Sequence, residues 1–329
     1  MRPVRHLRFP VRMNVLLVAA AAAGAISGGA GAAFPTKPIR VIVPYPAGGP
    51  TDTTARVIAP HMAEALGQQL VIDNRPGAST ILGTEMVAKA PPDGHTLLMV
   101  TSTISMNPSV FTKLPYDVQR DLVPVTQVIS TPFALLVHPS LPVRNTAQFI
   151  LLAKSRPGQL NHPSSGVGSA NHLAIVLFTR MTSIDVVHVP YKGTAQGIAA
   201  LVSGEMQFSF NNPIAGVPLM RTNKLRMLAT TGTARLAILP DVPVISEAVP
   251  GYEAGNWHAM FASGGTPRNV VARLQAEVAR TLAVPGVRKR FLELGAELGG
   301  SSPDAFAAFF RSEIDKWAKT VTAAGIKPE

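Results

Sequence analysis

The chain has 329 residues, of which 47% are hydrophobic and 15% charged, and it contains no cysteine. The missing cysteine excludes disulfides, thiolate metal sites and cysteine nucleophiles. The formal charge is +11, but aromatic residues make up only 6% and no dense lysine and arginine stripe occurs, so the sequence does not indicate a nucleic-acid partner.

Residues 1–33 are typical of a secretory signal peptide. Four arginines precede an apolar run from Val15 to Ile26, and Ala30-Gly31-Ala32 fits the small-x-small cleavage pattern. We therefore expect export to the periplasm, with cleavage near Ala32/Ala33. A retained membrane anchor is the alternative, but the apolar run is shorter than the ~20 residues that a spanning helix needs. The remaining length favours two domains.

The next segment alternates strand and helix patterns. Its strands are expected at Ile39 to Val43, Leu70 to Asp73 and Leu97 to Val100, and its helices at Thr53 to Leu66 and Leu82 to Ala90. This order predicts a mostly parallel sheet that is covered on both faces. Pro60 predicts a kink in the first helix or a restart near His61, because an interior proline removes an N–H and clashes with the preceding turn.

A glycine-containing turn, Pro44 to Asp52, joins the first strand to the first helix. Gly48 and Gly49 allow the backbone to approach a ligand and to turn its N–H groups outward, and the helix start adds unpaired donors and the positive end of its dipole. The turn therefore predicts an anion site made from main chain. The simpler alternative is that the two glycines only permit a tight turn.

A comparable serine- and glycine-rich loop, Ser164 to His172, runs into the apolar pattern that follows it. Two such loops more than a hundred residues apart suggest a ligand held from two sides. Both follow strands, and open α/β sheets bind ligands at the carboxyl ends of their strands.

The rest of the chain continues the alternation after a stretch without regular pattern that begins at Thr103. The C-terminal helices are expected to pack back on the first unit, which gives a discontinuous domain and a cleft. Further strands are expected at Val123 to Ile129, Phe133 to Val137, Val186 to Val189, Met206 to Phe210, Leu225 to Thr230 and Trp257 to Ala262, and further helices at Thr146 to Lys154, Asn171 to Met181, Thr194 to Val202, Pro267 to Val284, Val287 to Leu294 and Pro303 to Ala323.

An ordered series of short motifs extends along nearly the whole mature chain. They are Phe34 to Arg40, Pro44 to Asp52, Asp73 to Ala78, Ala90 to Gly94, Leu114 to Asp117, Ser164 to Leu173, His188 to Gly193, Leu239 to Pro243, Gly265 to Pro267 and Gly295-Ala296. In their order and spacing, the sequence resembles the exported solute-binding receptors of tripartite tricarboxylate transporters, also called the Bordetella uptake gene family.

The resemblance implies an α/β fold of the two-lobed periplasmic binding protein type (type II, Venus-flytrap), with a ligand cleft between two α/β domains. Domain 1 would comprise residues 34–130 and 255–329, and domain 2 residues 131–254. The implied protein is a monomeric receptor that captures a small organic carboxylate and delivers it to the membrane permease subunits of a tripartite tricarboxylate transporter. No catalysis, cofactor or metal is implied.

The site residues that the resemblance implies come from both lobes. The first lobe would reach the distal part of the ligand through ordered water, and the second would bind the carboxylate directly. The first-lobe residues are Tyr45, Ala47, Gly48, Gly49, Thr51, Asp52, Thr101 and Ser102, and the second-lobe residues are Ser164, Ser165, Gly168, Ser169, His172, Lys192, Gly193, Thr194, Ala195 and Asn211.

Several of these residues have a structural interpretation as well. Asp52 suits a helix N-terminus through the dipole, and Ser169 suits a helix N-cap. His172 is compatible with a packed core histidine, and Lys192 with a solvated charge. Many relatives have an acid where Asn211 stands; the amide removes a partner for a ligand ammonium, which disfavours an amino-acid ligand.

Two other classes of function are alternatives to a receptor. An exported hydrolase would use Ser169 and His172, but the two lie three residues apart on one helix turn without an evident orienting acid, and the sequence lacks the G-x-S-x-G and H-E-x-x-H patterns. An extracytoplasmic interaction module would bind no small ligand. Among receptors, the sequence is compatible with a tricarboxylate, a dicarboxylate or an aromatic acid, and with delivery to a transporter or a sensor.

Overall fold

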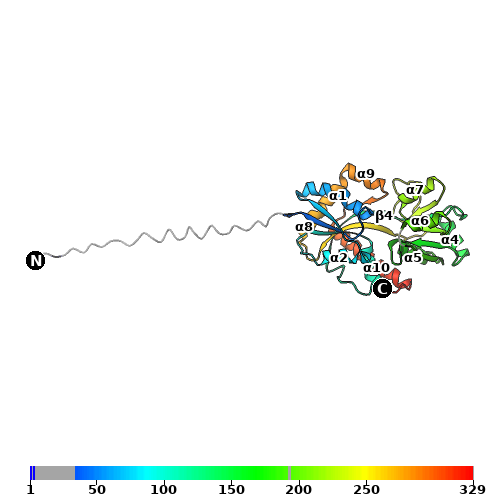
Figure 1. Ribbon diagram of the computed structural model, residues 1–329, viewed down its shortest axis with the longest axis horizontal. Helices are drawn as coiled ribbons and strands as arrows, with labels where there is room; N and C mark the ends of the chain where they lie inside the picture. Colours follow the sequence, from blue (N-terminus) through cyan, green and yellow to red (C-terminus); the bar gives the residue numbers. More distant parts are fainter. Residues whose placement is uncertain (2, 4–33, 192–193, 329) are drawn as a thin grey trace.

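The computed structural model describes residues 34–191 and 194–328, together with residues 1 and 3. Its elements form two lobes that lie side by side (Figure 1). We call the six-stranded sheet and its helices the first lobe, and the two smaller sheets and their helices the second lobe. The elements of the second lobe are green in Figure 1, between the blue and the orange-red parts of the chain.

The sheet of the first lobe has the strand order β11-β4-β10-β3-β1-β2. β1 pairs in parallel with β2 and β3, but β10 pairs antiparallel with β3 and β4, and β11 antiparallel with β4. The predicted mostly parallel sheet is therefore mixed, because the returning strand β10 enters its middle. The strands are β1 (Ile39–Val43), β2 (Leu70–Asn74), β3 (Thr96–Thr101), β4 (Leu122–Pro132), β10 (Gly255–Ser263) and β11 (Glu297–Leu298).

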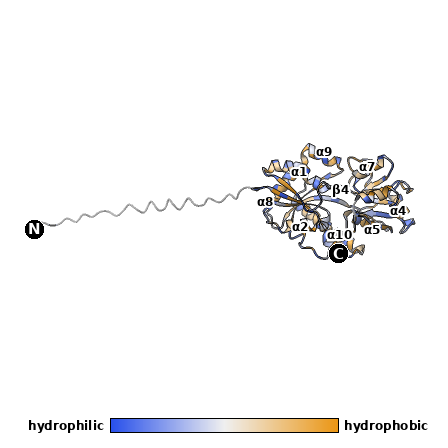
Figure 2. Cartoon of the chain, in the orientation of Figure 1, coloured by the Kyte–Doolittle hydropathy of each residue, from blue (hydrophilic) through white to orange (hydrophobic). Residues whose placement is uncertain are grey.

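Alternation along β1 and β3 divides the core of this lobe into two layers, as a strand's period of two requires. Val41 and Leu97 pack with α1 and α8 on one face, whereas Ile42 and Leu98 pack with α2 and α10 on the other. Figure 2 shows these strands mainly in the hydrophobic colour. The helices are α1 (Pro50–Leu66), α2 (Ile81–Ala88), α3 (Thr103–Val110), α8 (Arg268–Ala283), α9 (Pro285–Glu293) and α10 (Pro303–Ala323).

The second lobe contains a three-stranded antiparallel sheet, order β8-β5-β9, and the parallel pair β6-β7. Its core centres on Phe149, Phe178 and Phe208, which are fully buried, and the ring of Phe149 packs in a tilted arrangement against each of the other two. The elements are β5 (Ala134–Val137), α4 (Thr146–Ser155), β6 (Asn161–Ser164), α5 (Ala170–Thr182), β7 (Val187–Pro190), α6 (Thr194–Val202), β8 (Phe208–Asn211), α7 (Pro213–Arg221) and β9 (Arg226–Thr230).

Two chain crossings lie against each other where the lobes meet. Phe133 follows β4, and its N–H donates to Thr231 Oγ1 at 2.7 Å, while Thr231 N–H donates back to the Phe133 carbonyl at 2.8 Å. The Ala254 N–H, just before β10, donates to the Thr231 carbonyl at 3.3 Å. These bonds fix the connections on which the geometry between the lobes depends.

Three local expectations need correction. α1 runs through Pro60 as a single element and does not restart near His61, and Ile58 and Met62 on either side of Pro60 are buried against the sheet. The segment after Thr101 is not loop but α3, which packs against α10. α10 is not confined to the first lobe: Phe306 and Phe310 enter that core, whereas Trp317 and Val321 enter the core of the second lobe. Of the described helices, none is long and apolar enough to span a membrane.

Candidate ligand-binding cleft

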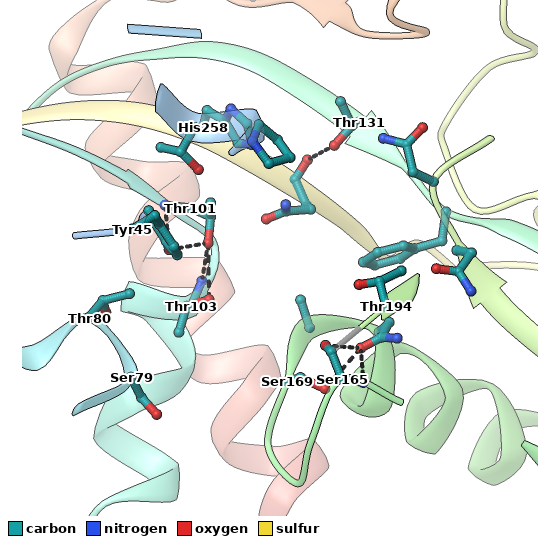
Figure 3. A pocket seen from close by; sticks show the side chains of 18 of the residues that line it. Tyr45, Ser79, Thr80, Thr101, Thr103, Thr131, Ser165, Ser169, Thr194 and His258 are labelled. Atoms are coloured by element: carbon teal, nitrogen blue, oxygen red, sulfur yellow. Dashed lines mark hydrogen bonds between the residues drawn. The ribbon is translucent and has the colours of Figure 1, made fainter. Parts of the chain in front are cut away.

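A cleft of about 870 Å³ opens between the lobes and is lined by residues of both. Its polar lining consists of hydroxyls, side-chain amides and one imidazole, and the described residues contribute no Asp, Glu, Lys or Arg to it. Figure 3 shows Tyr45, Thr101 and Thr103 on one side and Ser165, Ser169 and Thr194 on the other, with Thr131 and His258 above them. An uncharged cleft can hold an anion only through dipoles and hydrogen bonds.

The loop between β1 and α1 is held by the Asp52 carboxylate. Asp52 Oδ2 accepts from Gly48 N–H at 2.8 Å and from Arg56 Nε at 2.9 Å, and Oδ1 accepts from Asn74 Nδ2 at 3.0 Å. The Arg56 guanidinium beside Asp52 holds the pKa of that carboxyl below its ordinary value. The buried Asp52 thus stays ionised and shapes the loop from behind.

The glycine N–H groups of this loop were expected to face a ligand, and that expectation is wrong. Gly48 N–H donates to Asp52, and Gly49 N–H donates to the Pro46 carbonyl at 3.3 Å. Gly48 has φ of 80°, which explains the need for glycine. The donors left toward the cleft are those of the first turn of α1, at Thr51, where helix geometry provides no intrahelical acceptor.

Three hydroxyls form a connected group beside this loop. Tyr45 Oη lies 2.7 Å from Thr101 Oγ1, which lies 3.0 Å from Thr103 Oγ1. Thr101 N–H donates to Tyr45 Oη at 3.3 Å. Burial raises the pKa of Tyr45 above its ordinary value, so the phenol stays protonated and able to donate.

The serine-glycine loop of the second lobe is organised by one amide. Asn171 Oδ1 accepts from Ser165 Oγ at 3.0 Å and from Ser169 Oγ at 2.9 Å. Ser169 occupies the N-cap position of α5, but its side chain makes no capping bond. The N–H groups of Ala170 and Asn171 therefore remain available at the helix N-terminus, and both residues line the cleft.

A stack of three histidines supports this loop from below. The His172 and His188 rings lie 3.9 Å apart, and His162 lies 5.0 Å from His188, with interplanar angles near 20°. His172 Nδ1 accepts from Gly168 N–H at 3.1 Å, and His188 Nε2 lies 2.6 Å from Ser164 Oγ. Burial lowers the pKa of His162 to about 3 and of His172 to about 4, so both are neutral at pH 7.

The strands that join the lobes provide a third wall. His258 Nδ1 lies 2.8 Å from Thr54 Oγ1, and burial lowers the pKa of His258 to about 4. Thr131 Oγ1 donates to the Asn256 carbonyl at 2.9 Å, and the Asn256 side chain accepts from Ser102 Oγ at 3.0 Å. This wall is neutral as well.

Helix N-termini converge on the cleft from both lobes. α1, α5, α6 and α7 each place residues of their first turn or N-cap in the lining. The N-terminal end of a helix carries a partial positive charge, equivalent to about half an elementary charge, together with unpaired N–H donors. The cleft is therefore electropositive although its described lining holds no cation.

The structure brings many of the predicted site residues to one place, and their contact with a ligand stays a prediction. Those that line the cleft are Tyr45, Gly48, Thr51, Thr101, Ser165, Gly168, Ser169, Thr194 and Asn211. Asp52, Ser102, Ser164 and His172 stand behind the lining in the supporting bonds described above, and Ala47, Gly49 and Ala195 lie outside it. Lys192 and Gly193 are outside the described residues.

Other lining residues were not singled out from the sequence. They include Asn171, which lies within a quoted motif, and Asn107, Thr131, Asn256 and His258, which lie in segments interpreted as loop or core. The only signal in the sequence that could have pointed to these residues was a polar residue at the end of an expected strand. Which side of a strand faces the cleft depends on how the lobes pack.

Two α/β lobes with a cleft between them, in which the described lining residues carry no charge, are the architecture of a solute-binding protein. A family model described as tripartite tricarboxylate transporter family receptor, TctC, matches residues 54–326, so the chain belongs to this family. The family inferred from the sequence motifs is thereby confirmed. Such receptors are binding proteins, not enzymes.

Solved structures agree with this assignment. The chain is similar to an R. palustris protein with adipate, at 38% identity and a TM-score of 0.77, over 90% of this chain and 100% of that one. It is similar to MatC from Rhodopseudomonas palustris with bound malate, at 34% identity and a TM-score of 0.72, over 88% and 100%. The periplasmic binding protein BugD matches at 29% identity and a TM-score of 0.74, over 90% and 100%. The predicted periplasmic binding protein fold is confirmed.

Proposed function

We propose that this chain captures a small organic carboxylate in the cleft between its lobes. The observation that carries the proposal is a cleft whose described lining holds no charged side chain and at which α1, α5, α6 and α7 all begin. A carboxylate is stabilised at a helix N-terminus by the unpaired N–H groups and by the dipole. The first turn of α5, with Ser165 and Ser169 beside it, is the proposed carboxylate site.

The energies suffice without a buried cation. A hydrogen bond to a charged group contributes about 1.5–3 kcal/mol. Micromolar binding corresponds to about −8 kcal/mol, which a few such bonds supply together with burial of the apolar lining, after the cost of ordering is subtracted. The relatives with adipate and malate support a carboxylate as the ligand.

The proposed role in the cell follows from the family. The receptor would hand its ligand to the membrane permease subunits of a tripartite tricarboxylate transporter, act as a monomer, and reach the periplasm through a signal peptide removed near Ala32/Ala33. Its hinged lobes would be residues 34–130 with 255–329, and residues 131–254. Closure of these lobes around a ligand supplies a shape that a permease can recognise.

The hydrolase alternative lacks a nucleophile and base in contact. Ser169 Oγ lies 2.6 Å from the Gly166 carbonyl and 2.9 Å from Asn171 Oδ1, whereas His172 Nδ1 accepts from Gly168 N–H. Nucleophilic catalysis needs a hydrogen bond between the two side chains. The geometry thus favours binding without chemistry.

The proposal is tested on protein that has been unfolded and refolded, so that bound solute is lost. Calorimetry and thermal shift against a panel of dicarboxylates, tricarboxylates and aromatic acids should find at least one acid that binds and is recovered unchanged. An interaction module would be stabilised by no acid, and a hydrolase would convert an ester or amide of one.

Replacing Ser165 and Ser169 together by Ala should weaken the best acid about tenfold or more. Both hydroxyls donate to Asn171 Oδ1 without ligand, and each would turn its proton to the carboxylate when the acid binds. The fold should change little. Replacing Ser155 and Ser312 by Ala is a matched control, because both are exposed helical serines bonded to their own helix. Unchanged affinity in the Ser165 and Ser169 variant would place the carboxylate elsewhere.

A further inference from the structure

The segment between β2 and α2 has a strained backbone. Ala78, Ser79 and Thr80 have φ of 44°, 50° and 77°, three successive residues in the left-handed region. Residues other than glycine rarely adopt it, because Cβ approaches the following carbonyl oxygen. Such strain persists only where the surroundings enforce it, and it concentrates at functional sites.

This turn belongs to the wall of the cleft that faces the proposed carboxylate site. Ser79 and Thr80 line the cleft, on the side of Tyr45 and away from Ser165 and Ser169 (Figure 3). Neither was singled out from the sequence. The wall they form with Thr101 and Thr103 presents hydroxyl groups and no described charge.

The neighbouring helix enforces the turn. The amide of Asn107 on α3, which is 2% exposed, donates from Nδ2 to the Ser79 carbonyl at 3.2 Å and lies 3.3 Å from Thr80 Oγ1. Thr80 N–H donates to the Gly77 carbonyl at 3.0 Å. The Ser79 hydroxyl makes no hydrogen bond to any residue that the structure describes, so it remains free for a ligand. Glycines would relieve the strain but would remove both hydroxyls.

We propose that the turn Ala78–Thr80 determines ligand specificity at the end of the cleft opposite the carboxylate site. The Ser79 and Thr80 hydroxyls bind a second oxygen-bearing group of the ligand. This inference rests on the proposed function and narrows it: the receptor prefers a dicarboxylate to the monocarboxylate of equal length. The strain is retained because the turn aims these two side chains into the cleft.

The test compares acids of equal length, with succinate against butyrate, adipate against hexanoate and suberate against octanoate, by calorimetry on refolded protein. The wild type should prefer the dicarboxylate of the best pair by about tenfold or more. In the variant with Ser79→Gly and Thr80→Gly this ratio should fall at least about fivefold, and the unfolding midpoint should rise or stay the same as strain is relieved. Ser79→Ala keeps the backbone conformation, so it should lower the ratio and leave the unfolding midpoint as it is. This variant tests the inference if the double variant does not fold.

Ser183→Gly is the matched control. Ser183 has φ of 53° at the C-terminal end of α5 and does not line the cleft, so its replacement should relieve similar strain and leave the ratio unchanged. An unchanged ratio in both Ser79 variants would overturn the inference and leave the proposed function standing. A wild type that binds no acid of the panel would overturn the proposed function, and the inference with it.

Discussion

Asn171 and Asp52 each hold a loop of the cleft in place, and neither puts a charge into the lining. The Asn171 carbonyl oxygen gathers the hydroxyls of Ser165 and Ser169, and it stands at the first turn of α5. Asp52 does carry a charge, but the charge is buried behind the loop and paired with Arg56. An anionic ligand therefore meets dipoles, and the carboxylate of the protein is kept away from it.

A substitution at Asn171 tests anion binding in the cleft most sharply. Asn171→Asp keeps the acceptor oxygen for both serines but adds a negative charge to the lining. Like charges about 4 Å apart repel by about 4 kcal/mol in a partly screened site, so affinity for any carboxylate should fall about a hundredfold or more. Calorimetry measures this loss of affinity.

Asn145→Asp makes the same isosteric change away from the cleft. Asn145 Oδ1 caps α4 by accepting from Gln148 N–H at 2.9 Å, and a charge there should leave affinity as it is. If the Asn171 and Asn145 variants bind acids with equal affinity, the cleft is not an anion site.

At the scale of elements, the histidine stack ties β6, β7 and α5 together beneath the serine-glycine loop. His162 and His172 are buried and neutral, and His258 on β10 is as well. His172 accepts the Gly168 N–H through Nδ1, a bond that protonation of that nitrogen would abolish. The loop therefore depends on the neutral form.

Stability should fall in mild acid. The folded-state pKa values of His162, His172 and His258 are lowered to about 3, about 4 and about 4, while the unfolded chain titrates near pH 6.5. Below about pH 6.5 the unfolded state binds protons that the folded state does not, so the free energy of unfolding drops by up to about 1.4 kcal/mol per pH unit for each histidine. Urea unfolding at pH 7, 6 and 5 measures this slope.

The pH range in which stability falls distinguishes the effect of the histidines from that of the carboxylates. The pKa of Asp52 and of Asp73 is lowered in the fold, so their stabilising effect is lost only as the pH falls below about 4. His258→Gln should flatten the slope between pH 7 and pH 5 by about a quarter to a third, since it removes one of the four histidines whose pKa burial lowers, His162, His172, His188 and His258. A stability that does not change from pH 7 to pH 5 would contradict the assigned neutral stack.

Some elements could be predicted from the sequence, and others could not. The strand Ile39–Val43 and the helix Pro303–Ala323 were predicted at their observed bounds, because a short apolar run and a proline at the first turn are local signals. α3 was missed because Asn107 and Pro108 have low helix propensity, and packing against α10 stabilises it. The loops of the cleft were found from glycine and serine, whereas Ser79, Asn256 and His258 were missed, since packing alone directs them inward.

For the whole molecule, α10 is the element shared by both lobes. Its first half enters the core of the first lobe at Phe306, and its second half enters the core of the second lobe at Trp317. Glu313 between them accepts from Trp257 Nε1 at 3.0 Å and from Trp317 Nε1 at 3.2 Å. This shared helix couples the stability of the two lobes.

Trp317→Ala should lower the free energy of unfolding by about 3–5 kcal/mol, because the side chain is fully buried. Urea unfolding should still show one transition, since both cores lose support together. Phe309→Ala on the same helix is the control and should cost much less, as Phe309 is only partly buried. Two separate transitions in the wild type would show that α10 does not couple the lobes.

A crystal structure of refolded protein with the acid that binds best tests directly where the cleft holds a carboxylate. We predict one carboxylate at the first turn of α5, within hydrogen-bond distance of the Ser165 and Ser169 hydroxyls, with a second oxygen-bearing group toward Ser79 and Thr80. An acid that lies outside the cleft, or whose carboxylate lies away from the first turn of α5, would contradict it.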